Sequence, residues 1–165
     1  MSKKKTFVTL QQLKEIDKTY PTPYHLYDEK GIRDNARRLK EAFAWNKGFK
    51  EFFSVFATPN PYLIQILQEY GCGCDCSSMT ELMLSKAIGC KKGDIMFSSN
   101  DTPEAEFRYA NEIGGIINLD DITHIDFLEK VADIFRRRSV AVIIQAESLK
   151  SAMILWITRE MLNME

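Results

Sequence analysis

The chain has 165 residues, of which 45% are hydrophobic and 27% are charged. This is an ordinary composition for a soluble globular protein, and the length is sufficient for one domain with a sizeable core. Lys and Arg number 22 against 23 Asp and Glu, so the formal net charge is −1. Such a balance gives no general attraction to nucleic acid, and we expect no nucleic-acid partner.

The apolar stretches are too short for a membrane or export role. After Lys3–Lys5 polar and apolar residues alternate, so the uninterrupted apolar core of a signal peptide is missing. The stretch "SAMILWI" (151–157) is far shorter than the roughly 20 residues that a membrane-spanning helix needs. We therefore expect a cytoplasmic protein with no membrane partner.

From residue 24 onward the chain repeats one pattern: a short run typical of a strand, a polar turn, and an amphipathic helical stretch. Pro59 and Pro61 restrict the turn after the second run, and Thr102 and Pro103 are suited to start the fourth helix. The expected strands are "YHLYD" (24–28), "EFFSVF" (51–56), "CGCDCSS" (72–78), "DIMFSS" (94–99) and "GIINLDD" (115–121).

Five βα units with short connections predict an α/β fold with parallel strands and helical crossovers. Two architectures are compatible: a doubly wound sheet, and part of a (β/α)₈ barrel, which needs eight strands and about 250 residues when complete. Strand count by itself favours the doubly wound sheet. No G-x-G-x-x-G sequence follows the first expected strand, however, so a dinucleotide site of the Rossmann type is not indicated.

Three cysteines are clustered in "CGCDC", at Cys72, Cys74 and Cys76. The spacing differs from the C-x₂-C of common zinc sites, so no metal site is predicted. On a strand the three thiols share one face, while Asp75 and Ser77 face the other way. We interpret the thiols as a stripe of small apolar side chains facing the helices and remaining reduced in a cytoplasm.

Five segments resemble, in order and spacing, the first half of the barrel in diaminopimelate decarboxylases. These enzymes belong to the fold-type III pyridoxal-phosphate group, together with ornithine and arginine decarboxylases. The segments are "YPTPYHLYDEKGIRDNARRLKEAF", "FFSVFATPNPYLIQIL", "GCGCDCSSMTELMLSKAIG", "IMFSSNDTPEAEFRYA" and "INLDDITHIDFLEK", within residues 6 to about 134. The resemblance implies a partial (β/α)₈ barrel of the alanine racemase-like, pyridoxal-phosphate-binding type. It also implies a homodimer and an amino-acid substrate.

Phe56 stands where the family has the lysine that forms a Schiff base with pyridoxal 5'-phosphate. An amine can exchange with the amine of the substrate, whereas a phenyl ring cannot. The alternative is that Phe56 is an ordinary core residue of an unrelated βα protein. Its position at the carboxyl end of the expected strand, where barrel active sites assemble, favours the lost-lysine interpretation. Covalent binding of the cofactor is therefore not expected.

Asp75 and Ser78 match the "D-x-x-S" of the family, which lies close to the cofactor. The resemblance implies that both are remnants of the cofactor pocket. Asp75 has an alternative role as a structural carboxylate that ties the third expected strand to its neighbour.

The sequence divides into a lead-in segment (1–23), a half-barrel (24–135) and a divergent tail (136–165). No glycine or proline follows Gly115, although every earlier unit uses one in a turn. Codons for a family-like segment, read one nucleotide late, yield the Arg136–Arg138 run, "VIIQ" and the terminal "MLNME". We therefore expect a frameshifted tail. The alternative is a genuine amphipathic helix from Glu147 to Leu162.

The sequence thus predicts a truncated, inactive protein similar to diaminopimelate decarboxylase, whose intact relatives convert meso-diaminopimelate to lysine. Ornithine, arginine or carboxynorspermidine specificity is an alternative, because the substrate-reading residues of the family lie outside the resemblance. The rival from another class is a non-enzymatic, five-stranded flavodoxin-like binding module in which Phe56 lines an apolar pocket.

Overall fold

The computed structural model describes residues 6–100, 102–119, 121, 124–132, 140–144 and 153–157. This part of the chain contains one six-stranded sheet. Its strands are β1 (Phe52–Ser54), β2 (Gly73–Cys76), β3 (Ile95–Ser98), β4 (Ile116–Leu119), β5 (Val140–Ile144) and β6 (Met153–Ile157). The helices are α1 (Leu10–Thr19), α2 (Glu29–Ala42), α3 (Pro61–Gln68), α4 (Met79–Ala87), α5 (Glu104–Glu112) and α6 (His124–Ala132), with the short 3₁₀ helix η1 (Val55–Ala57).

The strands lie side by side in chain order, β1 to β6. Each of the first four is parallel to the next, and β6 is antiparallel to β5. A doubly wound sheet reverses its strand order at a switch point, and no reversal occurs here. Sequential order is what a (β/α)₈ barrel has, so the barrel-type α/β fold is confirmed and the flavodoxin-like alternative is wrong.

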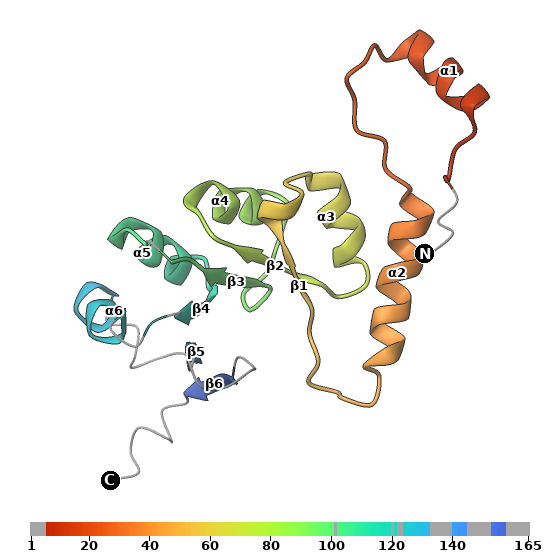
Figure 1. Cartoon of the computed structure of the whole chain (residues 1–165). Coiled ribbons are helices and arrows are strands. Elements are labelled where there is room, and N and C mark those ends of the chain that lie inside the picture. Colours follow the sequence, from red (N-terminus) through yellow and green to blue (C-terminus); the bar gives the residue numbers. More distant parts are fainter. Residues whose placement is uncertain are drawn as a thin grey trace.

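All four crossover helices pack on the same face of the sheet. Figure 1 shows α3, α4, α5 and α6 following one another along one side of the strands. Each contributes to one buried cluster with the alternate residues of the strands. Cys74 and Cys76 are fully buried in this cluster, so the predicted helix-facing stripe of thiols is observed. The members on the four crossover helices are Ile64, Leu82, Phe107, Ala110 and Leu128.

The expected first strand, residues 24–28, does not form. Leu26 and Tyr27 are exposed, and Asp28 caps α2 by accepting a hydrogen bond from the Gly31 N–H. A strand needs a hydrogen-bonded neighbour. Residues 24–28 do not pair with β1, which lies at one edge of the described sheet. The described residues therefore hold four βα units, β1–α3 to β4–α6, in place of five.

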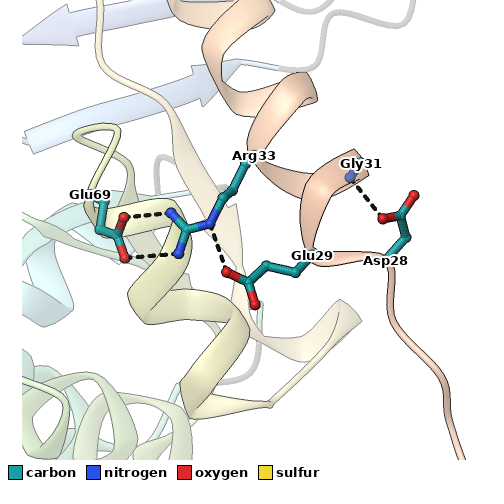
Figure 2. A network of polar contacts seen from close by, with 5 residues as sticks. All are labelled: Asp28, Glu29, Gly31, Arg33 and Glu69. Carbon is teal, nitrogen blue, oxygen red and sulfur yellow. Dashed lines mark hydrogen bonds and ion pairs between the residues drawn. The ribbon is translucent and has the colours of Figure 1, made fainter.

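α2 is attached to the sheet through α3. The Arg33 guanidinium forms two hydrogen bonds with Glu69, at 2.5 and 3.2 Å, and a third with Glu29 at 2.8 Å. Figure 2 shows the guanidinium between the two carboxylates. An apolar groove of about 370 Å³ separates α2 from the β1–α3 unit and is lined by residues such as Ala36, Phe53 and Leu67. α1 buries none of its residues and stands apart from the sheet in Figure 1.

The tail is described only at its two strands. β5 continues the parallel sheet next to β4, and β6 occupies residues 153–157, which lie inside the range of the alternative helix from Glu147 to Leu162. That alternative is therefore wrong for these five residues. Arg136–Arg138 lie outside the described residues. Among the helices that the structure describes, none combines the length and the apolar character required to cross a bilayer.

Candidate functional site

The carboxyl end of β1 turns sharply before the first crossover. β1 ends at Ser54, and η1 follows at once, with the Thr58 N–H donating to the Val55 carbonyl at 3.2 Å. The expected strand therefore ends two residues before Phe56. The turn leaves Val55 fully buried and the Phe56 side chain 77% exposed. Phe56 is thus not a core residue, and it lies at the edge of the sheet where barrel active sites assemble.

Asp75 lies on the adjacent strand, directly opposite Ser54 of β1 and Met96 of β3 in the register. Because side chains alternate along a strand, Asp75 faces away from the helices on which Cys74 and Cys76 pack. Its Oδ1 atom is buried and has no hydrogen-bond partner among the described residues. An orphaned carboxylate oxygen of this kind is able to accept a hydrogen bond from a ligand.

Burial raises the pKa of the Asp75 carboxyl above its usual value of 3.8. The nearby Ser98 side chain acts in the opposite direction, and the negative charge of Glu81 adds to the increase. Asp75 is therefore a half-buried acid whose charged form is disfavoured by its surroundings. This is compatible with a role in binding a cationic or hydrogen-bond-donating group.

Two further polar side chains continue this face across the sheet. Ser98 and Asn118 are paired in the register of β3 and β4, and the Asn118 side-chain amide donates to Ser98 Oγ at 3.2 Å. Asn118 is buried. The sequence reasoning missed both residues, although the period-2 alternation in "IMFS" and "IINL" places them on the face of Asp75. Asp75, Ser98 and Asn118 form what we call the inner polar row.

Ser78 is the N-cap residue of α4, three positions after Asp75. Its hydroxyl donates to Glu81 Oε1 at 2.9 Å, and the Ser77 N–H donates to Glu81 Oε2 at the same distance. Glu81 is buried. The sequence reasoning missed Glu81, which the capping pattern Ser-x-x-Glu indicates. The Ser78 hydroxyl is therefore engaged with a carboxylate of its own helix.

The structure brings the three predicted site residues to one edge of two neighbouring strands. Phe56 follows β1, Asp75 lies within β2, and Ser78 follows β2. Of the two polar members, Asp75 has an oxygen able to accept a hydrogen bond from a ligand, whereas the Ser78 hydroxyl is engaged with Glu81. Phe56 has no nitrogen, so it cannot bond covalently to an aldehyde. Among the described residues, no group of three or more His, Cys, Asp or Glu side chains is arranged to hold a metal ion.

Sequential parallel strands with helices on one face define a segment of a β/α barrel, and the polar row at the carboxyl ends of the strands is its candidate site. A family profile described as "Pyridoxal-dependent decarboxylase, pyridoxal binding domain" matches residues 29–158. The chain belongs to this family, whose cofactor is pyridoxal phosphate.

Named relatives agree with this membership. Protein TabA of Pseudomonas amygdali pv. tabaci is 37% identical over 142 residues, which are 85% of this chain and 34% of TabA. The diaminopimelate decarboxylase of Thermoplasma acidophilum is 33% identical over 109 residues, 66% of this chain and 27% of that enzyme. The chain thus spans about a third of the length of these curated relatives.

Solved structures show the same fold. The Helicobacter pylori diaminopimelate decarboxylase complexed with L-lysine has a TM-score of 0.70 and 23% identity, over 79% of this chain and 33% of that one. SrLDC in complex with PLP and cadaverine has a TM-score of 0.71 and 18% identity, over 90% of this chain and 38% of that one.

Proposed function

We propose that this chain is a diaminopimelate decarboxylase-like protein that does not catalyse decarboxylation. The observation that carries the proposal is the position of Phe56, directly after β1 at the active edge of the barrel segment. At that position the family resemblance requires a lysine. A phenyl ring cannot form the covalent bond that retains the cofactor, and it cannot exchange protons with a substrate.

Diaminopimelate is the proposed ancestral substrate because several relatives carry that enzyme name. Those of Thermoplasma acidophilum and Methanothermobacter thermautotrophicus are 33% and 31% identical to this chain. The structural neighbours also include an ornithine decarboxylase from Entamoeba histolytica, at 22% identity, which supports the fold alone. Specificity for ornithine, arginine or carboxynorspermidine is therefore the less favoured alternative.

The remaining residues retain polar functions without the covalent step. When bound to a family member, the cofactor supplies an electron sink for the carbanion left by departing carbon dioxide. In this chain we assign to Asp75 the acceptance of a hydrogen bond at its orphaned Oδ1. Ser98 and Asn118 extend the polar surface on which a ligand would rest. Ser78 acts through Glu81, by holding the first turn of α4 in place.

The Phe56→Lys substitution tests the proposal directly. The full chain is incubated with pyridoxal phosphate, treated with borohydride, freed of unbound cofactor and mapped by mass spectrometry. We expect no labelled peptide around position 56 in the wild type and a labelled lysine in Phe56→Lys. Tyr62→Lys is the matched control, because Tyr62 lies on α3 and is also 77% exposed. It should remain unlabelled under conditions that label Phe56→Lys.

Three outcomes contradict the proposal. Cofactor retained covalently by the wild-type chain would show that Phe56 does not abolish attachment. Equal labelling of Phe56→Lys and Tyr62→Lys would show that position 56 has no site around it. Decarboxylase activity of the wild type toward meso-diaminopimelate would overturn the inactivity directly.

We also propose that the chain associates with itself in the cytoplasm, as the family resemblance implies. The support is the outer edge of β1. In the described sheet β1 pairs with β2 on one side, and its other edge is unpaired. Unpaired strand edges favour association with another chain. Sedimentation should show a dimer or larger species. A compact monomer at micromolar concentration would contradict this expectation.

The tail is proposed to be encoded in a shifted frame after residue 135. The support is the codon argument, although the family match runs on to residue 158. Sequencing the genomic locus through codon 56 and beyond the stop provides the test. Glycine-rich loops encoded downstream in the neighbouring frame would support the shift, and a downstream region without such coding capacity would contradict it.

A further inference from the structure

Two thiols lie in contact on the helix side of the sheet, away from the inner polar row. The Sγ atoms of Cys74 and Cys90 are 3.3 Å apart. Cys74 belongs to β2 and is fully buried, whereas Cys90 follows α4 and is half-buried. Gln68 of α3 donates its side-chain amide to Cys90 Sγ at 3.0 Å. The proposed function uses neither thiol.

We propose that Cys74 and Cys90 are a modification site that forms a reversible disulfide with a low-molecular-weight disulfide as oxidant. A disulfide bond is 2.03–2.05 Å long, so the two sulfur atoms must approach by roughly 1.3 Å. Cys90 lies outside the regular elements, between Gly89 at φ +86° and the short turn before β3. The backbone adjustment therefore falls on a connecting segment, and β2 keeps its place in the sheet.

The protonation of the pair favours the reaction at neutral pH. The hydrogen bond between the two thiols lowers the pKa of Cys74 to about 7, against the opposing effect of burial. The pKa of Cys90 is raised for the same reason. One proton is then shared between two sulfur atoms, so a thiolate is available, which is the reactive form in disulfide exchange.

The small disulfide reaches the pair at Cys90, the half-buried thiol. A hollow of about 270 Å³ is lined by Gln68, which donates to Cys90 Sγ, and by Gly89 and Lys91, the chain neighbours of Cys90, together with Gly71, Cys72 and Asp94. As Cys90 attacks one sulfur of the small disulfide, its proton passes to the Cys74 thiolate and the first small thiolate leaves. Cys74 then gives its proton to solvent and attacks Cys90 Sγ, which releases the second thiolate. One small disulfide is reduced to two thiols, and the two protein thiols become one disulfide.

The other cysteines are less suited to this reaction. Cys76 is fully buried, its Sγ is 3.1 Å from Ser85 Oγ, and burial raises its pKa to about 12. Cys72 is half-buried, and burial raises its pKa as well. Selective pairing of Cys74 with Cys90 is therefore the specific expectation.

The test is thiol trapping on the full, reduced chain. The chain is equilibrated with mixtures of glutathione and glutathione disulfide, quenched with N-ethylmaleimide in denaturant and mapped by mass spectrometry. We expect a Cys74–Cys90 cross-linked peptide to accumulate as the oxidised fraction rises, with Cys72 and Cys76 alkylated. Cys74→Ser and Cys90→Ser should abolish the cross-link, and Cys76→Ser should retain it.

A parallel reaction in concentrated urea guards against chance pairing. Without the fold, the four cysteines should give a mixture of cross-links. If the native chain yields the same mixture as the unfolded chain, the proposal is overturned. It is also overturned if Cys90 remains as a mixed disulfide with glutathione while Cys74 stays free. Neither result depends on whether the chain binds pyridoxal phosphate.

Discussion

Glu106 of α5 accepts a hydrogen bond from the backbone N–H of Met79, the first residue of α4, at 3.1 Å. The Ser78 side chain caps no backbone N–H of α4, since its hydroxyl donates to Glu81. A side chain from the next βα unit thus takes over part of the capping. Because the first N–H groups of a helix have no partner inside the helix, this contact couples two neighbouring units.

Loss of this contact should destabilise the fold. We expect Glu106→Ala to lower the free energy of unfolding by about 1 kcal/mol, the usual effect of removing a helix cap. Glu104→Ala is the control, because Glu104 makes an exposed ion pair with Arg108 of the kind usually worth less than about 1 kcal/mol. Urea denaturation measures both. An equal loss in the two variants would contradict the capping role.

Neighbouring positions in η1 should respond very differently to truncation. Val55→Ala removes two buried methyl groups and should cost about 2 kcal/mol of stability. Phe56→Ala should change stability by less than about 0.5 kcal/mol, because the ring is mostly exposed. Thermal denaturation of both variants provides the measurement. A large loss in Phe56→Ala would mean that the ring is packed in the chain as it exists in solution.

Gly73 should not tolerate a side chain. A Cβ atom there would lie 2.5 Å from the Asp94 carbonyl oxygen and 2.6 Å from Phe52 Cδ1. We expect Gly73→Ala to cost about 1–3 kcal/mol through displacement of β3 and Phe52. Gly48→Ala is the matched control, since its nearest contact would be at an ordinary 3.5 Å. Comparable denaturation midpoints for the two variants would contradict the packing at Gly73.

The raised pKa of Asp75 makes a prediction about pH. The folded chain holds this proton more tightly than the unfolded chain, whose carboxyl titrates near 3.8. The favourable contribution of the group is therefore present below that value and is lost as the pH rises through the folded-state pKa. Asn does not titrate, so Asp75→Asn is free of this pH-dependent loss of stability. The stability of the variant relative to the wild type should therefore increase between about pH 3 and about pH 7.

Asp94 supplies a control of opposite sign. Burial acts to raise its pKa, but hydrogen bonds from the Lys50 side chain and the Lys91 backbone lower it overall. Its contribution is present above the unfolded value and is lost as the pH falls. Asp94→Asn should therefore lose stability relative to the wild type over the same rise in pH. Urea titrations at each pH measure both variants, and parallel profiles would contradict the assigned environments.

Local pattern in the sequence was enough to find most of the elements and several face assignments. Helical spacing of apolar residues predicted the five helices from α2 to α6, because a helix that packs on a core must present one apolar stripe. Period-2 alternation placed Cys74 and Asp75 on opposite faces of β2, as observed. The same reasoning placed Phe56 at the carboxyl end of the strand. The expected strand ran two residues too far, because β1 ends at Ser54 and Phe56 lies in η1.

What local pattern could not decide depends on contacts between residues far apart in the chain. Residues 24–28 have the composition of a strand, but they do not pair with the open edge of β1 in the described sheet. A strand forms only through such pairing, which local composition does not decide. Strand order, which separated a barrel segment from a doubly wound sheet, likewise depends on pairing. The bond from Met79 to Glu106 joins two neighbouring βα units, and the contact of Cys74 with Cys90 joins β2 to the segment that follows α4. Both depend on the packing of the helices on one face of the sheet. Residue types and their periodicity thus determined most of the elements, and the order of five motifs indicated the family by resemblance, whereas the neighbours of each site residue followed from the tertiary structure.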